Sequence, residues 1–243
     1  MKTLRLLLLL AVPGATALAR SPEASAPPPL PRQVASFGAA LSTDGSVWCY
    51  GGHAGERHEY NREDVHGTLR RWLPGTEAWI DFAEGEPSQG ASLIADGDRI
   101  LRIGGMAARN APEEDQDLWS SDTVTAFTIA DGKATDLPPM PARRSSHDSV
   151  IVGRTLYVFG GWSLEGGSGR GKSHWHTTYL TLDLDHTEAG WKQHEQPFSK
   201  RAVAVAALGN RIYVLGGMDD ANDISRGVDV LDVKSGRWSK GPD

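Results

Sequence analysis

Histidine and tryptophan alternate at His174, Trp175 and His176, and this run has the residue types best suited to chemistry. Alternate side chains of an extended segment point to the same side, so the two imidazoles lie together at a spacing that can hold a metal ion. A complete metal site would need further ligands, such as His53 or His66, from a distant part of the sequence. Because these histidines suit ordinary polar loops equally well, we expect no metal and no cofactor.

Two other motifs match the residue pattern of a known functional site but lack the structural context that such a site requires. Residues 166–173 fit the glycine-rich phosphate loop, but that loop works only when a helix follows and its amide groups surround the phosphates. Here the β-branched and aromatic residues 175–180 follow and predict a strand. Residues 145–148, Ser-Ser-His-Asp, have the residue types of a catalytic triad. However, neighbouring residues on a strand point to opposite faces, so we expect no triad.

Four glycine doublets define the elements that must position these residues. The doublets recur every 53, 56 and 56 residues, and each follows a run of four strand-forming residues. Nearly every position in these runs is apolar, which is typical of a strand buried on both faces. A fixed period near 50 residues, without sustained helical periodicity, predicts an all-β array of repeats. The doublets are Gly51–Gly52, Gly104–Gly105, Gly160–Gly161 and Gly216–Gly217.

The repeat unit resembles the kelch motif, and its last copy shows the resemblance best. Apolar residues 203–208, a tight turn and the run 211–217 are followed by a second pair of strand-like segments that ends at Trp238. The resemblance implies four strands per repeat, A to D, in one antiparallel sheet, with the sheets arranged as blades around a channel. It covers residues 33–243, and the implied blades span about residues 33–83, 84–138, 139–195 and 196–243.

The resemblance also implies structural roles for repeat positions outside the doublets. A tryptophan on strand D should be buried between blades, and an Arg-x-x-His pattern should open strand A of blade 3. Blade 2 is the weakest copy, because Arg102 interrupts its strand B and Ala134 stands where the tryptophan should be. The implied structural residues are Trp79, Trp191, Trp238, Arg144 and His147.

Four repeats are fewer than the six or seven blades that the resemblance to kelch-like proteins implies for a closed ring. Strands A to D occur four times in order, and no spare strand at either end would join blade 1 to blade 4. We therefore expect an incomplete ring whose first and last blades expose apolar faces. Because large apolar patches are rare on soluble monomers, these faces would require missing blades, self-association or another partner.

Loop lengths distinguish the two ends of the expected propeller. The turns between strands A and B are short, whereas the segments between strands B and C are about 10 to 17 residues long in blades 1 to 3 and rich in charged and aromatic residues. Loops longer than a turn requires are commonly functional, and rigid scaffolds present binding residues on such loops. We therefore expect the end with the B–C and D–A loops to bind a ligand. The candidate binding residues are Arg57, His58, Arg109, Trp162, His174, Trp175 and His176.

The N-terminus has the pattern of a secretory signal peptide. Lys2 and Arg5 flank the start of an apolar run, and Ala17 and Ala19 fit a cleavage site after Ala19. We expect residues 1–19 to be removed on export to the periplasm or the extracellular space, and residues 20–32 to form a proline-rich linker. The apolar run is shorter than the ~20 residues that cross a bilayer, so no transmembrane segment is expected.

Composition narrows the class of partner. The formal net charge is −6, and it becomes about −8 without Lys2 and Arg5, which argues against nucleic acid as a partner. The single cysteine, Cys49, lies in a strand-forming run and is expected to be a small buried hydrophobic residue.

These observations favour a secreted or periplasmic propeller that binds a protein or a glycan. The alternative is an enzyme, because some kelch-like propellers of the periplasm interconvert the anomers of sialic acid. Such a mutarotase needs an acid and a base that face one sugar ring. An acidic and basic pocket shared by several blades would favour the enzyme, and a flat aromatic surface would favour the binding module.

Overall fold

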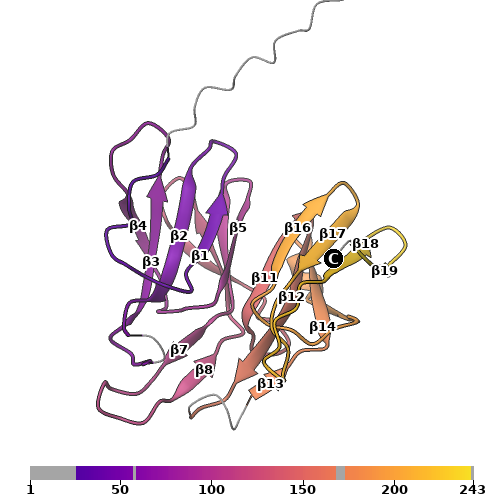
Figure 1. The fold of residues 1–243 in the computed structure, drawn as a ribbon. Helices are drawn as coiled ribbons and strands as arrows, with labels where there is room; N and C mark the ends of the chain where they lie inside the picture. The colour runs from indigo at the N-terminus through magenta and orange to yellow at the C-terminus, as the bar shows by residue number, and fades with distance from the viewer. Residues whose placement is uncertain (1–25, 57–58, 168–172, 242–243) are drawn as a thin grey trace, which may run out of the picture.

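Four antiparallel β-sheets form most of the chain in the computed structural model, which describes residues 26–56, 59–167 and 173–241 (Figure 1). Each sheet contains four strands that pair in the order of the sequence, and the third sheet has the short strand Ser173–Trp175 in addition. The predicted all-β architecture with four four-stranded blades is therefore confirmed. Blade 1 contains β1 (Gly38–Leu41), β2 (Val47–His53), β3 (Val65–Trp72) and β4 (Ile80–Glu84). Blade 2 contains β5 (Ser92–Asp96), β6 (Arg99–Ile103), β9 (Val124–Thr128) and β10 (Ala134–Leu137).

The other two blades follow the same plan. Blade 3 contains β11 (Ser145–Val152), β12 (Thr155–Leu164), β14 (Thr178–Asp183) and β15 (Lys192–Glu195). Blade 4 contains β16 (Ala204–Leu208), β17 (Arg211–Leu215), β18 (Val228–Asp232) and β19 (Arg237–Lys240). The remaining elements are β7 (Met106–Ala108), β8 (Leu118–Ser120), β13 (Ser173–Trp175) and the short 3₁₀ helix Thr187–Ala189.

A chain of backbone hydrogen bonds aligns the innermost strands, which are β1, β5, β11 and β16. One residue with a left-handed backbone lies at or just before the start of each of them: Ser36, Gly90, Ser146 and Ala202, with φ between 52° and 60°. The amide groups of Gly90, Ser146 and Ala202 each donate to the carbonyl oxygen of the equivalent residue one blade earlier, at 2.7–2.8 Å. These three bonds hold the blades in a common register around a central cavity of about 260 Å³.

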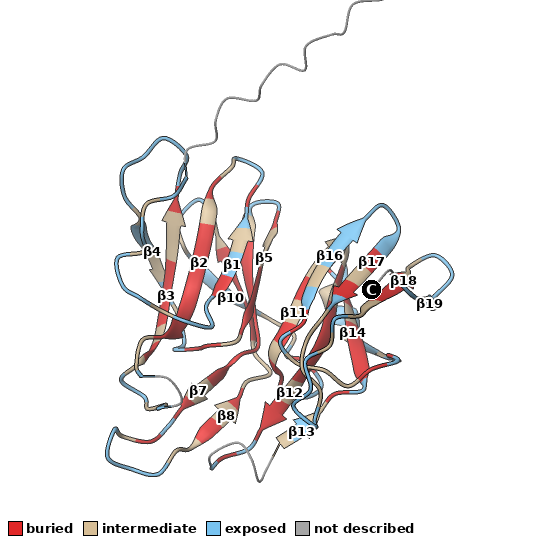
Figure 2. Cartoon of the chain, in the orientation of Figure 1, coloured by how far each residue is buried: buried red, intermediate tan, exposed pale blue. Residues whose placement is uncertain are grey.

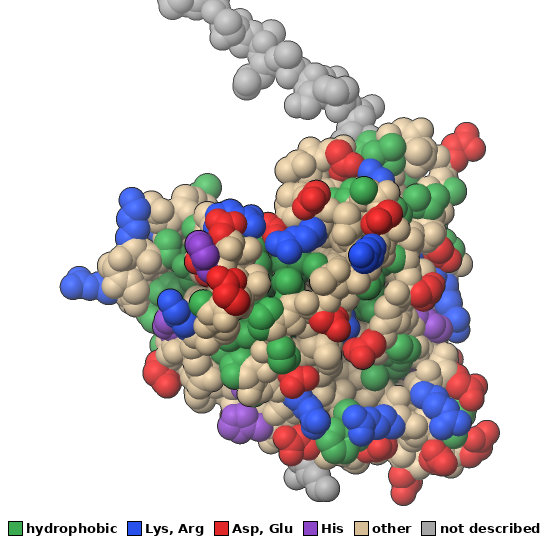
Figure 3. Space-filling model, turned by 180° about the vertical axis from the view of Figure 1, so that it is seen from behind, with side chains coloured by type: hydrophobic (Ala, Val, Ile, Leu, Met, Phe, Trp, Pro, Cys, Tyr) green, Lys and Arg blue, Asp and Glu red, His purple; other side chains and the backbone are tan. Residues whose placement is uncertain are grey.

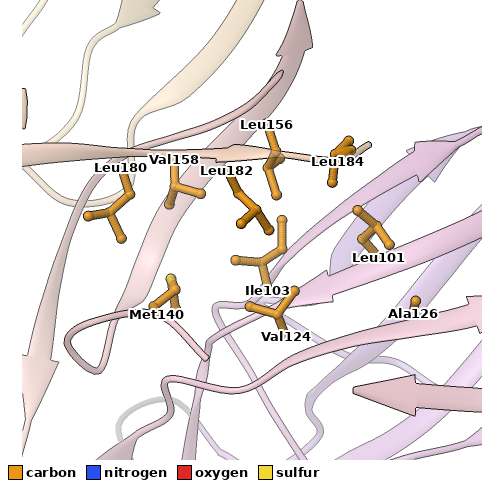
Figure 4. Packing of buried hydrophobic residues seen from close by; sticks show 10 residues of the cluster. All are labelled: Leu101, Ile103, Val124, Ala126, Met140, Leu156, Val158, Leu180, Leu182 and Leu184. Atoms are coloured by element: carbon orange, nitrogen blue, oxygen red, sulfur yellow. The ribbon is translucent and has the colours of Figure 1, made fainter. Parts of the chain in front are cut away.

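Hydrophobic clusters fill the three contacts between successive blades. Leu101 and Ile103 of blade 2 pack against Leu156 and Val158 of blade 3 in the cluster shown in Figure 4. Corresponding clusters join blade 1 to blade 2 and blade 3 to blade 4. Within the described residues no such cluster joins blade 4 to blade 1, so the blades form an open arc, as expected.

The glycine doublets lie at these contacts. A side-chain carbon on Gly160 would lie 2.7 Å from the carbonyl oxygen of Lys200 in the next blade, and the amide of Gly161 donates to that oxygen at 2.7 Å. The doublets of blades 1 and 2 make the same contacts with the blade that follows. At Gly216 the nearest atom is 3.4 Å away and belongs to Ser225 of the same blade. The glycine doublet therefore lets the chain turn at the end of the strand and also lets the next blade approach closely.

Exposed apolar side chains mark the two ends of the arc. Strand β16 is largely exposed, whereas its counterpart β11 is largely covered (Figure 2). All of the large exposed hydrophobic residues in the described part of the chain belong to blade 1, blade 4 or their flanking segments. They are Phe37, Leu41, Leu73, Ile80, Leu208, Leu215 and Ile224.

Arg102 does not interrupt its strand, contrary to the expectation from the sequence. It is part of β6 and almost fully buried. Its guanidinium group donates to Thr123 Oγ1 at 2.6 Å and to Thr125 Oγ1 at 3.2 Å, and it forms an ion pair with Glu86 at 3.2 Å. These partners compensate for the loss of water, so an arginine fits where the other blades have an apolar residue.

The proline-rich segment lies against blade 1 in its described part, residues 26–32. The indole nitrogen of Trp79 donates to the carbonyl oxygen of Pro28 at 2.9 Å. Trp191 makes the same bond to Pro138 at 2.8 Å, which shows that the two proline segments hold equivalent places beside blades 1 and 3. The expected signal peptide lies outside the described residues. Among the described residues, no helix is long and apolar enough to cross a membrane.

Candidate functional site: an arginine cleft at the end of the B–C segments

The B–C segments of blades 2 and 3 contain strands where the sequence suggested loops. Strands β7 and β8 form a hairpin, and β13 pairs with the last residues of β12; all of them lie at the lower end of the molecule in Figure 1. An antiparallel bridge between Trp119 and Glu165 connects the two insertions. Hydrophobic packing stabilises these strands, because Met106 and Leu118 of the hairpin form a small cluster with the fully buried Leu164 of blade 3.

Blade 1 contributes to the same layer. The side-chain amide of Asn110 donates to the carbonyl oxygen of Tyr60 at 2.9 Å, and the backbone amide of Arg62 donates to the carbonyl oxygen of Asn110 at 3.0 Å. The Tyr60 ring packs against the cluster around Leu164. Segments of three blades thus build one ordered layer at this end of the propeller.

Arginine side chains line a cleft of about 430 Å³ in this layer. Arg62 comes from blade 1, Arg109 and Trp119 come from the β7–β8 hairpin, and Arg143 comes from the D–A segment between β10 and β11. The guanidinium carbons of Arg109 and Arg143 lie 4.2 and 5.1 Å from the centre of the Trp119 ring system, which is the geometry of a cation–π contact. The Trp119 indole donates to Asp117 at 2.8 Å, and this bond fixes the orientation of the ring.

The side chains that line this cleft carry a net positive charge, whereas the chain as a whole is negative. Four arginines and two carboxylates line it, and one of these carboxylates, Glu86, is paired with the buried Arg102. None of the ion pairs in the described part of the chain includes Arg62, Arg109 or Arg143. Seen from behind, the lower end of the molecule carries Lys and Arg side chains beside hydrophobic ones, with acidic side chains around them (Figure 3).

A second cavity, of about 480 Å³, adjoins the cleft and shares Asp122 and Arg143 with it. It is lined on the blade 3 side by Glu165, His174 and His176. His174 is exposed, whereas His176 is buried and its ring donates from Nε2 to the carbonyl oxygen of Arg143 at 3.0 Å. Burial lowers the pKa of His176 to about 3, so this imidazole is neutral at ordinary pH and positions the arginine.

Two predicted binding residues, Trp162 and Trp175, form a separate cluster with Arg201. The guanidinium carbon of Arg201 lies 4.3 Å from the centre of the Trp162 ring system and 5.5 Å from that of Trp175. All three side chains are half-buried, and Trp162 packs against the cluster around Leu164. Burial also lowers the pKa of Arg201. The predicted residues Arg57 and His58 lie outside the described residues.

Residues assigned to the repeat lie between the blades or beside them. Arg144 is buried and donates to the carbonyl oxygens of Gly160 and Thr178 at 2.7 and 3.0 Å, and burial lowers its pKa to about 9. His147 is buried as well, and burial lowers its pKa to about 3. Trp238 packs into the cluster between blades 3 and 4, and Trp191 packs against the cluster between blades 2 and 3.

Trp79, Trp191 and Trp238 were predicted to be buried on strand D, and all three are half-buried. Trp79 and Trp191 lie one residue before strands β4 and β15. The rings of His174 and His176 are 5.3 Å apart. Among the described residues, no group of three or more His, Cys, Asp and Glu side chains could hold a metal ion.

Comparison with known proteins agrees with this architecture. A family model described as the Kelch motif matches residues 200–243, which contain all of blade 4. The solved structure of YjhT aligns with a TM-score of 0.70 over 89% of this chain and 67% of its own, at 17% sequence identity. The chain therefore has a β-propeller fold, and its blade 4 matches the Kelch motif. At that identity the similarity to YjhT concerns the fold alone.

The chain is also similar in sequence to parts of three curated proteins. Beta-scruin of Limulus polyphemus is 24% identical over 178 residues, which cover 70% of this chain and 18% of that protein. Human host cell factor 2 is 28% identical over 138 residues, which cover 50% of this chain and 16% of that protein. Host cell factor homolog hcf-1 of Caenorhabditis elegans is 32% identical over 118 residues, which cover 42% and 15%. The chain therefore spans less than a fifth of the length of these relatives.

Sequence reasoning selected Arg109 but not Arg62, Trp119 or Arg143. Arg62 and Trp119 are in the long B–C segments, so their position in the chain was a usable signal. Arg143 stands next to the structural Arg144 in a D–A segment, and nothing in the local sequence distinguishes it. Its role becomes visible only when blade 2 packs against blade 3.

Proposed function

We propose that this propeller is an exported binding module that engages a protein or glycan through its B–C and D–A segments. One observation carries the proposal: arginines from two B–C segments and one D–A segment line a single cleft, and they have no carboxylate partner among the described residues. Charged groups left unpaired at the mouth of a rigid scaffold suit recognition better than stability, since exposed charges contribute little to stability.

The kelch-propeller fold is consistent with a protein-binding module. Export is supported by the basic, apolar and small-residue pattern of residues 1–19. Mass spectrometry of the secreted protein tests this part of the proposal. A chain beginning at Arg20 is the expected result, and a chain that retains Met1 or Lys2 would contradict it.

Site-specific photo-crosslinking tests which end of the propeller is used. A benzophenone amino acid in place of Ala142, an exposed residue beside the cleft, should capture a partner from the extracellular or periplasmic fraction of the source organism. The matched control is Lys234, an exposed turn residue between strands C and D at the opposite end. Crosslinks from Lys234 and none from Ala142 would contradict the proposal.

A sugar mutarotase is the second candidate, and the cavity beside the cleft favours it. This cavity brings Glu165, His174 and Asp122 together from two blades, so a carboxylate and an imidazole face one concave space. An acid and a base facing one sugar ring are the minimum for anomer exchange. One-dimensional NMR of freshly dissolved sialic acid tests this candidate. A faster approach to the equilibrium anomer ratio, lost on Glu165→Gln, is the result an enzyme should give.

A further inference from the structure

We propose that the cleft between Arg62, Arg109 and Arg143 recognises an acidic segment of a partner protein, with its carboxylate side chains held by Arg109 and Arg143. This inference rests on the proposed binding function and specifies the chemistry of the ligand. It follows from the charge, the rigidity and the shape of the cleft.

The charge of the cleft matches a carboxylate ligand. A guanidinium group offers planar, paired N–H donors that fit a carboxylate with two parallel hydrogen bonds. Arg62 and Arg109 are exposed and Arg143 is half-buried, and none of the three has an ion-pair partner in the described part of the chain. Asp122, which lines both cavities, and Glu165, which lines the second cavity, carry the opposing charge. Arginines therefore outnumber the carboxylates, and an incoming anion is favoured.

Two of the arginines, Arg109 and Arg143, are held in place before any ligand arrives. The Trp119 ring supports the guanidinium groups of Arg109 and Arg143, and the Trp119 indole is tied to Asp117. Asp117 is itself bonded to the amide of Gly167 at 3.2 Å. The backbone of Arg143 is held by the buried ring of His176. Side chains that are already ordered lose less entropy on binding, so each contact contributes more affinity.

The shape of the site favours an extended peptide over a single sugar. Because the two cavities share Asp122 and Arg143, they lie side by side between Arg62 of blade 1 and His174 of blade 3. Sugars commonly bind by stacking on an exposed aromatic face, but two guanidinium groups already lie over the Trp119 ring. Met106 and Pro87 line the cleft as well and suit the aliphatic parts of peptide side chains. The observations together favour a protein segment with several Asp or Glu residues.

Fluorescence anisotropy with the full chain tests this inference. The probe is a labelled peptide of alternating Glu and Gly, and its control is the same peptide with Gln in place of Glu. We expect the Glu peptide to bind at least about tenfold more tightly, and its affinity to fall about tenfold between 50 and 300 mM salt, because screened charges attract less. Equal binding of the two peptides, or no binding of either, would overturn the proposal.

Charge-neutralising variants locate the binding site. Arg109→Gln and Arg143→Gln should each weaken binding of the Glu peptide about fivefold or more, while Arg109→Lys should retain part of the affinity. The matched control, Arg211→Gln, removes an equal charge from an exposed position at the opposite end of blade 4 and should change affinity less than about twofold. Circular dichroism of each variant establishes that it is folded. Equal losses for Arg109→Gln and Arg211→Gln would overturn the proposal.

Competition separates this inference from the broader binding function. If a polyuronate or inorganic phosphate binds more tightly than the Glu peptide, the ligand is another kind of anion, and the proposal of an acidic protein segment is refuted. Crosslinking at Ala142 to a partner without an acidic segment would refute the acidic ligand but leave the binding module intact. If the Glu peptide does not bind and no partner crosslinks at Ala142, both the acidic ligand and the binding module would be refuted.

Discussion

Two arginine–tryptophan clusters lie at the same end of the propeller, and they differ in what surrounds them. In the first, Trp119 lies under Arg109 and Arg143, and Arg109 is exposed at the mouth of the cleft. In the second, Arg201 covers Trp162 and Trp175, and Trp162 packs into the hydrophobic cluster around Leu164.

The contrast shows that residue type does not decide between binding and stability. Stacking on tryptophan is common to both clusters, but only the first leaves guanidinium N–H groups facing an open cleft. Arg201 is instead half-buried, and its guanidinium group lies 3.3 Å from the sulfur of Met218. The Trp162 cluster joins the B–C layer to blade 4, and we propose that the Trp119 cluster presents charge to a ligand.

The largest expected effect is on the stability of the Trp162 cluster. Trp162→Ala removes a large half-buried ring from the contacts with Leu164 and Arg201, and it should lower the free energy of unfolding by about 3 kcal/mol. Guanidinium chloride denaturation measures this change. A loss below about 1 kcal/mol would mean that Trp162 is free to bind a ligand, as its sequence alone suggested.

The next effect concerns the pH dependence of stability, which depends on the buried His176. The folded-state pKa of His176 is about 3, below the ordinary histidine value of 6.5, so the unfolded chain binds more protons between these two values. Stability should therefore fall as the pH drops below 6.5 towards 3, by about 1 kcal/mol per pH unit for His176.

Denaturation curves at pH 7, 5.5 and 4 test this pH dependence. His176→Gln should reduce the slope, and part of the slope should remain because the pKa of His147 is lowered in the same direction. Equal slopes in the wild type and the His176→Gln variant would show that the ring is not buried neutral.

A smaller effect distinguishes the two arginines. Arg201→Lys keeps the charge but loses the flat guanidinium surface over Trp162 and Trp175, so it should cost about 1 kcal/mol of stability. Arg109→Lys should change stability by less, because Arg109 is exposed. Thermal melts of both variants give the comparison, and a reversed order would exchange the roles that we assign to the clusters.

The smallest effect on stability is expected for Arg109→Gln. Substitution of an exposed arginine outside any ion pair should change the free energy of unfolding by no more than about 0.5 kcal/mol. The same protein should show the weakened binding of the Glu peptide described above. A variant that loses stability and binding together would indicate that Arg109 supports the fold.

The repeat architecture could be predicted because each blade encodes its own strands and its contact with the next blade. Gly160 and Gly161, for example, mark both the end of an apolar run and the place where the carbonyl of Lys200 approaches. The strands of the B–C layer could not be predicted, because β7 and β8 depend on contacts with Leu164 about fifty residues later in the chain. Arg143 was missed for the same reason, since the cleft exists only after blades 1 to 3 have packed.

The most direct test of the difference between the two clusters is an NMR titration of the tryptophan indoles. The chain has eight tryptophans, so ¹⁵N labelling gives a small set of indole signals that single Trp→Phe variants can assign. On addition of the Glu peptide, we predict that the Trp119 signal shifts while those of Trp162 and Trp175 stay in place. A shift of Trp162 or Trp175 with an unchanged Trp119 would contradict our assignment of the binding site.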